Sequence, residues 1–290
     1  MGLNSIKHVC VAGCGTMGRQ IAMNAAIYGY DVKIYDLSEA SRENCRKWSE
    51  EYLQGRIDKG RMTVEQVEDI KSRFNIFDSL EAAASDADLV IETIVEIEDV
   101  KRSFLKQVSA IVREDTILAS NSSYMPTSLF ANDVVNPGRM ANLHYSNPAI
   151  VMKMAEIASG EHTKKETVDT LMEFARSVGK VPVWIRKEID GFIGNRIKRC
   201  IDREARWLVE NGYCTPQDVD TVLETGYGYP KGPFRLLDMT GVDLAFVVLR
   251  EKYEKTGIKD PGYDMLEKMY NEGRWGVKTG KGFYDYTDNK

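Results

Sequence analysis

The chain has 290 residues, of which 43% are hydrophobic and 29% are charged. These are the proportions of a folded globular protein with room for about two domains. A net charge of −5 argues against a nucleic-acid-binding protein, and no apolar run reaches the roughly 18–20 residues that span a membrane.

The five cysteines are scattered and form no C-x-x-C pair, which argues against a disulfide framework and a zinc site. The first residues carry no apolar signal segment. We therefore expect a cytoplasmic protein that binds neither nucleic acid, membrane nor metal.

The start of the chain predicts a β-α-β unit. His8–Ala12 is a nearly continuous apolar run, typical of a strand that is buried on both faces. Three glycines follow at once with the spacing G-x-G-x-x-G (Gly13, Gly15 and Gly18). A helix is expected to begin there, and residues 31–36 predict the second strand.

The rest of the chain divides into two parts. Residues 38–71 predict charged helices that are interrupted at Lys59-Gly60. Further buried strands are expected at residues 89–92, 117–120 and 140–143. Alternating strands and helices imply a mostly parallel sheet. From Gly191 onward the sequence has helical periodicity and no convincing strand.

These patterns together predict an α/β fold with two domains. Residues 1–187 are expected to form a Rossmann-type dinucleotide-binding domain. Residues 188–290 are expected to form an all-α domain. Within the second domain, Thr215 and Pro216 predict the start of a helix, with the Thr215 hydroxyl as its N-cap.

The glycine motif and Asp36 point to a nicotinamide cofactor. Gly13 permits a tight turn, Gly15 lets the backbone approach a pyrophosphate, and Gly18 lets the helix pack against the strand. Asp36 lies 18 residues after Gly18, at the end of the second expected strand. Because its carboxylate can accept hydrogen bonds from ribose hydroxyls and repel a 2′-phosphate, the combination favours NAD over NADP.

His144 is the best candidate for an acid–base group. It follows an apolar strand, and ligands of open α/β sheets bind at the carboxyl ends of the strands. Glu156 is a carboxylate within the apolar run 154–157, where it needs a partner. A His/Glu pair forms a base whose tautomer is fixed and whose cation is stabilised. His8 and His162 have ordinary structural interpretations.

Ser123 also ends a predicted strand, within Asn121-Ser122-Ser123. Short polar side chains at this point either bind a substrate oxygen or cap the next helix. The residues alone leave both interpretations open.

At essentially full length, the chain resembles the L-3-hydroxyacyl-CoA dehydrogenases, with a pattern most like the bacterial 3-hydroxybutyryl-CoA dehydrogenases. Besides the glycine motif, the matching segments are 90–96, 119–123, 143–148, 151–156, 191–196, 232–234 and 278–284. The resemblance implies transfer of a hydride between NAD and C3 of a short-chain 3-hydroxyacyl thioester, within fatty-acid β-oxidation or butanoate metabolism. It also implies a homodimer formed through the C-terminal domain.

The resemblance assigns further roles to individual residues. His144 matches the catalytic base, Glu156 the carboxylate that orients it, and Ser123 and Asn195 the groups that face the substrate's 3-oxygen. Lys59 matches a lysine that reaches the CoA portion. The implied NAD contacts are Gly13, Gly15, Thr16, Met17, Gly18, Asp36, Glu96, Lys101, Asn147 and Lys278.

Several residues depart from the family's pattern near the substrate. Lys231 replaces an apolar residue, and Arg199 and Arg203 lie on one face of an expected helix with Arg196 and Arg206. Such a stripe usually forms a solvated or interface network. The alternative is that Arg199, Arg203 and Lys231 bind an anionic acyl tail or a free carboxylate.

Two other functions remain open at this point. One is the same chemistry on a polar or free 3-hydroxy acid, as in the carnitine and gulonate dehydrogenases. The other is a non-catalytic role, as in the related lambda-crystallin of the lens.

Overall fold

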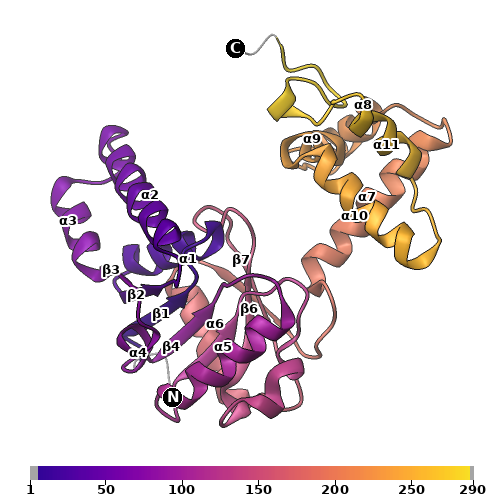
Figure 1. Ribbon diagram of the computed structural model, residues 1–290. Helices are drawn as coiled ribbons and strands as arrows, with labels where there is room; N and C mark the ends of the chain where they lie inside the picture. Colours follow the sequence, from indigo (N-terminus) through magenta and orange to yellow (C-terminus); the bar gives the residue numbers. More distant parts are fainter. Residues whose placement is uncertain (1–5, 288–290) are drawn as a thin grey trace. The chain divides into compact units, whose positions relative to one another are not determined.

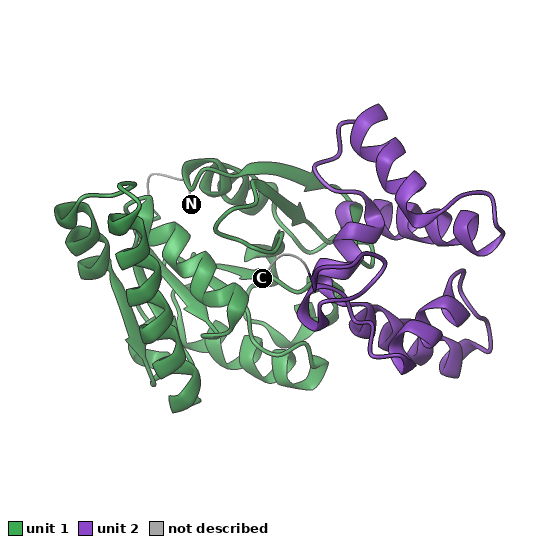
Figure 2. Ribbon diagram, turned by 90° about the horizontal axis from the view of Figure 1, so that it is seen from above, with its two compact units in different colours: residues 1–193 green, residues 194–290 purple. Residues whose placement is uncertain are grey.

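The computed structural model describes residues 6–287 and divides the chain into two compact units, Met1–Ile193 and Gly194–Lys290 (Figure 2). The sequence placed the division six residues earlier, between 187 and 188. Residues 1–5, which formed part of the expectation about a signal segment, lie outside the described range. Within that range, no helix is long and apolar enough to cross a membrane.

Unit 1 is built on one eight-stranded sheet with the strand order β3-β2-β1-β4-β5-β6-β7-β8 (Figure 1). The first six strands in this order are parallel, β7 runs antiparallel to β6, and β8 is parallel to β7. The strands are β1 (His8–Ala12), β2 (Asp31–Tyr35), β3 (Phe74–Phe77), β4 (Leu89–Glu92), β5 (Ile117–Ser120), β6 (Met140–Tyr145), β7 (Met154–Ala158) and β8 (Val181–Ile185). This arrangement confirms the Rossmann-like first domain with a mostly parallel sheet.

The helices of unit 1 cover both faces of this sheet. They are α1 (Thr16–Ile27), α2 (Glu39–Asp58), α3 (Val64–Arg73), α4 (Leu80–Ala84), α5 (Glu98–Ile111) and α6 (Lys165–Ser177), with 3-10 turns at Thr127–Asp133 and Pro137–Arg139. The break between α2 and α3 confirms the interruption expected at Lys59-Gly60.

The strand β1 shows why the central strands are apolar throughout. Val9 and Val11 belong to the core that also holds residues of α1 and α6, whereas Cys10 and Ala12 belong to the core beneath α4 and α5. All four side chains are at most 1% exposed. Alternate residues thus pack on opposite faces, as the continuous apolar run predicted.

Unit 2 is helical, which confirms the expected all-α second domain. It contains α7 (Phe192–Glu210, whose first two residues belong to unit 1), α8 (Pro216–Thr221), a π-helical turn (Val222–Gly226), α9 (Pro233–Thr240), α10 (Val242–Thr256), α11 (Tyr263–Asn271) and a 3-10 turn (Val277–Thr279). Thr215 caps α8 as expected, because its hydroxyl accepts a hydrogen bond from the Asp218 amide at 3.2 Å.

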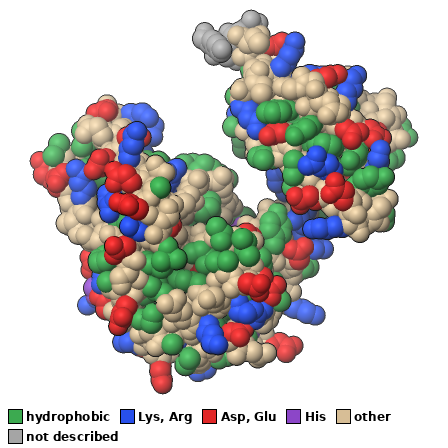
Figure 3. Space-filling model, viewed as in Figure 1, with side chains coloured by type: hydrophobic (Ala, Val, Ile, Leu, Met, Phe, Trp, Pro, Cys, Tyr) green, Lys and Arg blue, Asp and Glu red, His purple; other side chains and the backbone are tan. Residues whose placement is uncertain are grey.

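Charged side chains of both signs lie mixed together on the outer surface. On the visible face of α2, acidic and basic side chains alternate in patches (Figure 3). Several of them form ion pairs along the helix, such as Arg46 with Glu43 at 3.1 Å. Exposed pairs of this kind contribute little to stability.

Candidate active site

The three glycines of the G-x-G-x-x-G motif lie in the turn between β1 and α1. Gly13 has a φ of 111°, and a Cβ there would lie 2.7 Å from the Thr93 carbonyl oxygen. At Gly18 a Cβ would lie 1.9 Å from the Gly13 carbonyl oxygen. At Gly15 a Cβ would meet nothing within 4 Å. Gly13 and Gly18 are therefore required by packing, whereas the open side of Gly15 leaves the N-terminus of α1 free to receive phosphate oxygens.

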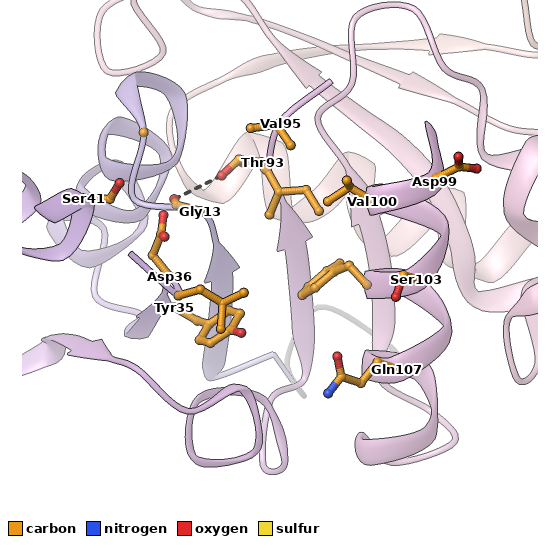
Figure 4. Close-up of a pocket in the computed structure, with 14 residues that line it drawn as sticks. Gly13, Tyr35, Asp36, Ser41, Thr93, Val95, Asp99, Val100, Ser103 and Gln107 are labelled. Atoms are coloured by element: carbon orange, nitrogen blue, oxygen red, sulfur yellow. Dashed lines mark hydrogen bonds between the residues drawn. The ribbon is translucent and has the colours of Figure 1, made fainter. Parts of the chain in front are cut away.

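A cavity of about 640 Å³ opens beside this turn. Figure 4 shows Tyr35 and Asp36 at the end of β2 on one side and Ser103 and Gln107 of α5 on the other. The lining residues are Gly13, Gly15, Tyr35, Asp36, Leu37, Ser41, Thr93, Ile94, Val95, Asp99, Val100, Ser103, Phe104 and Gln107. A cavity of this size between the ends of β1, β2 and β4 has the location of a dinucleotide site in a Rossmann fold.

The Asp36 carboxylate is fixed at the mouth of this cavity. Its Oδ2 accepts a hydrogen bond from the Cys14 amide at 2.8 Å, and its Oδ1 accepts one from the Ser38 amide at 2.8 Å. Each oxygen keeps a further lone pair. The carboxylate is therefore held in place while it can still accept hydrogen bonds from ribose hydroxyls.

His144 and Glu156 form a close pair on adjacent antiparallel strands. They are directly opposite each other in the β6–β7 register, and His144 Nδ1 lies 2.9 Å from Glu156 Oε2. Both are buried, at 7% and 1% exposure. The other ring nitrogen, Nε2, lies 3.1 Å from the Ser123 hydroxyl oxygen. The three residues that the sequence singled out thus form one Ser–His–Glu chain of polar contacts.

A second carboxylate network supports the Ser123 end of this chain. The Lys101 ammonium is 1% exposed and lies 2.6 Å from Glu92 Oε1 and 3.1 Å from Glu96 Oε2. Glu96 Oε1 in turn accepts hydrogen bonds from the Ser122 hydroxyl and, at 3.2 Å, from the Ser123 amide. Lys101 therefore fixes Glu96, and Glu96 fixes the loop that carries Ser123. A direct contact between Lys101 and a cofactor stays a prediction.

Two parts of this site were missed by the sequence reasoning. The first is Glu92, which ends an apolar strand just as Glu156 lies within one. A carboxylate in an apolar run is therefore the signal that could have identified it. The second is the Ile193 amide, which donates to Glu156 Oε1 at 2.9 Å. A backbone donor leaves no signature in residue types, so no sequence pattern points to it.

Lys59 lies at a different cavity of unit 1, of about 460 Å³. Lys59 caps the C-terminus of α2. Other residues of α2 and of the turn after it line the same cavity, among them Tyr52, Arg56 and Arg61. A cavity lined by several cations suits an anionic group.

Asn147 and the two other histidines complete the predicted residues of unit 1. Asn147 is exposed just after β6. His8 lies at the start of β1, with Nδ1 3.7 Å from Asp31 Oδ2. His162 lies in the turn after β7, with Nε2 3.3 Å from the Thr127 hydroxyl. Neither His8 nor His162 touches the Ser–His–Glu chain in the described contacts.

The remaining predicted residues belong to unit 2. Asn195 is half-buried in the first turns of α7, and Lys231 is exposed before α9. The Lys278 ammonium pairs with Asp243 at 2.6 Å. Arg199 and Arg203 are exposed on α7.

The arginine stripe on α7 is not uniform. The Arg206 Nε donates to the Pro261 carbonyl at 2.8 Å, and burial lowers the pKa of this guanidinium. On the same helix, Glu210 accepts a hydrogen bond from the Gly262 amide, and Asp202 pairs with Lys198. Arg206 therefore holds together parts of unit 2.

Both units match one family in sequence. Residues 8–189 match the model described as the NAD-binding domain of 3-hydroxyacyl-CoA dehydrogenase, and residues 191–286 match the model of the C-terminal domain. The two matches meet within a few residues of the division between the units, after Ile193.

Curated relatives and solved structures match nearly the whole length of the chain. A probable 3-hydroxybutyryl-CoA dehydrogenase of Bacillus subtilis is 34% identical over 98% of both chains. A 5-formyl-3-hydroxy-2-methylpyridine 4-carboxylate 5-dehydrogenase of Mesorhizobium japonicum is 32% identical over 97% of this chain and 91% of its own. The crystal structure of (S)-3-hydroxybutyryl-CoA dehydrogenase from Ralstonia eutropha superposes with a TM-score of 0.85 at 31% identity, covering 98% of this chain and 100% of that one.

Proposed function

Because the chain belongs to the 3-hydroxyacyl-CoA dehydrogenase family, we propose that it interconverts a short-chain (S)-3-hydroxyacyl-CoA and the corresponding 3-oxoacyl-CoA. The observation that carries this proposal is the Ser123–His144–Glu156 chain at the carboxyl end of β6. It provides a base with one fixed ring nitrogen and one available ring nitrogen.

The cofactor of this family is NAD, and the residues of unit 1 fit it. The open side of Gly15 and the N-terminal amides of α1, at Thr16 and Met17, would hold the pyrophosphate. The fixed Asp36 carboxylate would hold the ribose and repel a 2′-phosphate. When bound, NAD supplies the hydride acceptor for oxidation and, as NADH, the donor for reduction. Contacts of Glu96, Lys101, Asn147 and Lys278 with NAD are further parts of the proposal, supported by the family resemblance.

The proton is handled by His144. With Nδ1–H donated to Glu156 at 2.9 Å, Nε2 is the basic nitrogen and takes the proton of the 3-hydroxyl group during oxidation. The Glu156 carboxylate then stabilises the imidazolium. In reduction the imidazolium returns the proton to the 3-oxygen.

Ser123 and Asn195 would position the 3-oxygen. Ser123 contacts His144 Nε2 at 3.1 Å, so an oxygen that contacts one of these groups lies close to the other. Asn195 matches the family asparagine that faces the same oxygen. Asn195 lies on α7. We assign residues 188–290 the role of a substrate and dimerisation domain, and the contact of Asn195 with the substrate is part of that role.

The cavity at Lys59 supports the proposal that the substrate carries a CoA portion. Lys59, Arg56 and Arg61 line it together, and phosphate groups bind well to clusters of Lys and Arg. The CoA nucleotide carries such phosphates. We assign Lys59 to this part of the substrate.

A free or polar 3-hydroxy acid is the alternative substrate, and one comparison favours it. The Mesorhizobium relative is named for a pyridine carboxylate rather than a CoA thioester. Arg199, Arg203 and Lys231 are the residues of unit 2 that would bind such a carboxylate or an anionic acyl tail. The family resemblance also supports a homodimer and a cytoplasmic role in fatty-acid or butanoate metabolism.

The substrate is tested by NADH oxidation with three compounds in parallel: acetoacetyl-CoA, free acetoacetate and a dicarboxylic 3-oxoacyl-CoA. We expect turnover of acetoacetyl-CoA to exceed that of acetoacetate. Turnover of acetoacetate or of the dicarboxylic compound alone would overturn the short-chain CoA assignment and implicate Lys231 and the arginines. NADH binding without turnover of any of the three would favour the non-catalytic role.

A further inference from the structure

Phe192 has a backbone conformation that is unusual for its side chain. Its φ is 48°, and the only other non-glycine residue with a positive φ in the described range is Asn136. Asparagine tolerates this region through its short polar side chain, whereas a bulky aromatic residue there is an outlier. Such a conformation persists only where the surrounding structure holds it, which is common next to functional groups.

The surroundings that hold Phe192 include the His–Glu pair. The Phe192 side chain is 1% exposed and packs in a small apolar cluster with Ala158 of β7 and Ile185 of β8. Its ring centroid lies 5.2 Å from that of His144, with the two rings tilted by 42°. The ring therefore packs directly against the imidazole.

The left-handed turn at Phe192 also directs the next amide. Ile193 N–H donates to Glu156 Oε1 at 2.9 Å, while Glu156 Oε2 contacts His144 Nδ1 at 2.9 Å. Both carboxylate oxygens are thus engaged, one by the base and one by the first turn of α7. Because a hydrogen bond from a backbone N–H favours the charged form of a carboxylate, the Ile193 amide stabilises Glu156 as the anion.

From this geometry we infer that Phe192 is a positioning residue for the base of the proposed reaction. Its ring limits the movement of the His144 imidazole, and its backbone presents the Ile193 amide to Glu156. Together these contacts keep the Nδ1 proton on the Glu156 side and Nε2 directed toward Ser123.

The first experiment observes the imidazole itself and needs no substrate. The protein is labelled with ¹⁵N-histidine, and the His144 signals are assigned with the variant His144→Ala. In the wild type we expect one neutral tautomer, with the proton on Nδ1. In Phe192→Ala the Nε2–H tautomer should appear as well, because the ring that limits the imidazole is gone and its packing no longer holds residue 192 at this φ. An unchanged single tautomer in Phe192→Ala would overturn the inference.

The second experiment measures catalysis by full-length variants, each normalised to its number of NADH-binding sites. Phe192→Ala should lower kcat about 10- to 100-fold and change the NADH dissociation constant and the KM for acetoacetyl-CoA by less than about twofold. Phe192→Tyr keeps the ring and should retain most of kcat. It also provides the comparison if the alanine variant folds poorly. Retention of kcat by the alanine variant would contradict the inference.

Phe174→Ala is the matched control, because Phe174 is also a fully buried phenylalanine of unit 1 but packs in a different cluster and contacts neither His144 nor Glu156 in the described contacts. We expect it to lower stability without changing the tautomer or kcat per NADH site. If Phe174→Ala lowers kcat as much as Phe192→Ala, the role of Phe192 is only structural. The inference rests on the proposed function through the kinetic experiment alone. If the wild type turns over none of the substrates, the proposed function fails while the tautomer experiment still decides the role of Phe192.

Discussion

His144 Nδ1 and Glu156 Oε2 lie 2.9 Å apart across the antiparallel pair β6–β7, the one place where the sheet reverses direction. Residues directly opposite in such a pair have neighbouring side chains. The reversal therefore brings a histidine at the carboxyl end of one strand beside a carboxylate in the middle of the next. The connection between the two strands, residues 146–153, is only eight residues long, which is too short for a parallel crossover.

Replacement of the base should stop catalysis and leave cofactor binding intact. We expect His144→Ala to lower kcat by about 10²- to 10⁴-fold, the usual contribution of a general acid–base group. The NADH dissociation constant, measured by fluorescence titration, should change little because His144 does not line the cavity beside Gly13 and Asp36. Near wild-type turnover in this variant would disprove the assignment of the base.

Glu156→Gln should be nearly as damaging, although it changes the side chain little in size. The Ile193 amide needs an acceptor, so the glutamine oxygen would turn toward it. The glutamine NH₂ group would then face His144 Nδ1, which must become an acceptor and leave the proton on Nε2. An equivalent change beside the histidine of a serine protease costs about 10⁴-fold in kcat, and steady-state kinetics would show a similar loss. Glu156→Asp is the control, since it keeps the charge.

The sequence predicted the polar groups of this site better than the contacts that orient them. His144, Glu156 and Ser123 stand out because polar residues at the ends of buried strands need a reason to be there. Phe192 and the Ile193 amide do not stand out. An aromatic residue and a backbone N–H become relevant only through a φ of 48°, which depends on tertiary packing.

The fold shows the same contrast. Central strands such as β1 were predicted because burial on both faces gives a continuous apolar run. The strand β3 was missed, since Phe74–Phe77 is only partly buried and lies at the edge of the sheet. Neither the strand β7 nor its direction was predicted. Strand polarity depends on the length and path of the connection, and residues 146–153 between β6 and β7 carry no hairpin signal of the Asn-Gly type.

Asp36→Asn should weaken the preference for NAD over NADP. The amide keeps one oxygen acceptor but loses the charge that repels a 2′-phosphate. We expect the ratio of kcat/KM for NADH to that for NADPH to fall by about tenfold or more, which corresponds to roughly 1.4 kcal/mol. The neighbouring variant Ser38→Ala removes the N-cap hydroxyl of α2 but no charge, and it should leave this ratio unchanged. An unchanged ratio in Asp36→Asn would remove the ribose role.

Lys59→Ala should distinguish binding of the CoA nucleotide from binding of the acyl group. If Lys59 binds the nucleotide phosphates, the variant should raise the KM for acetoacetyl-CoA about tenfold or less, the effect of one exposed charge-assisted contact. The KM for acetoacetyl-N-acetylcysteamine, which lacks the nucleotide, should not change. Lys47→Ala, on the exposed side of α2, is the matched control. Equal effects on both thioesters would show that Lys59 does not act through the nucleotide.

The stability of unit 1 should depend on pH through His162. Burial lowers the pKa of His162, against the opposing effect of Glu188, and the side chain lies beside the Thr127 hydroxyl. The unfolded chain has the ordinary histidine pKa of about 6.5. As the pH falls below this value, the unfolded state takes up a proton that the folded state does not, so the free energy of unfolding decreases.

The variant His162→Gln removes this coupling between protonation and stability. The free energy of unfolding, followed by urea titration at about pH 7.5 and about pH 5.5, should therefore decrease less in the variant than in the wild type. A decrease of the same size in both proteins would show that His162 stays protonatable in the folded state.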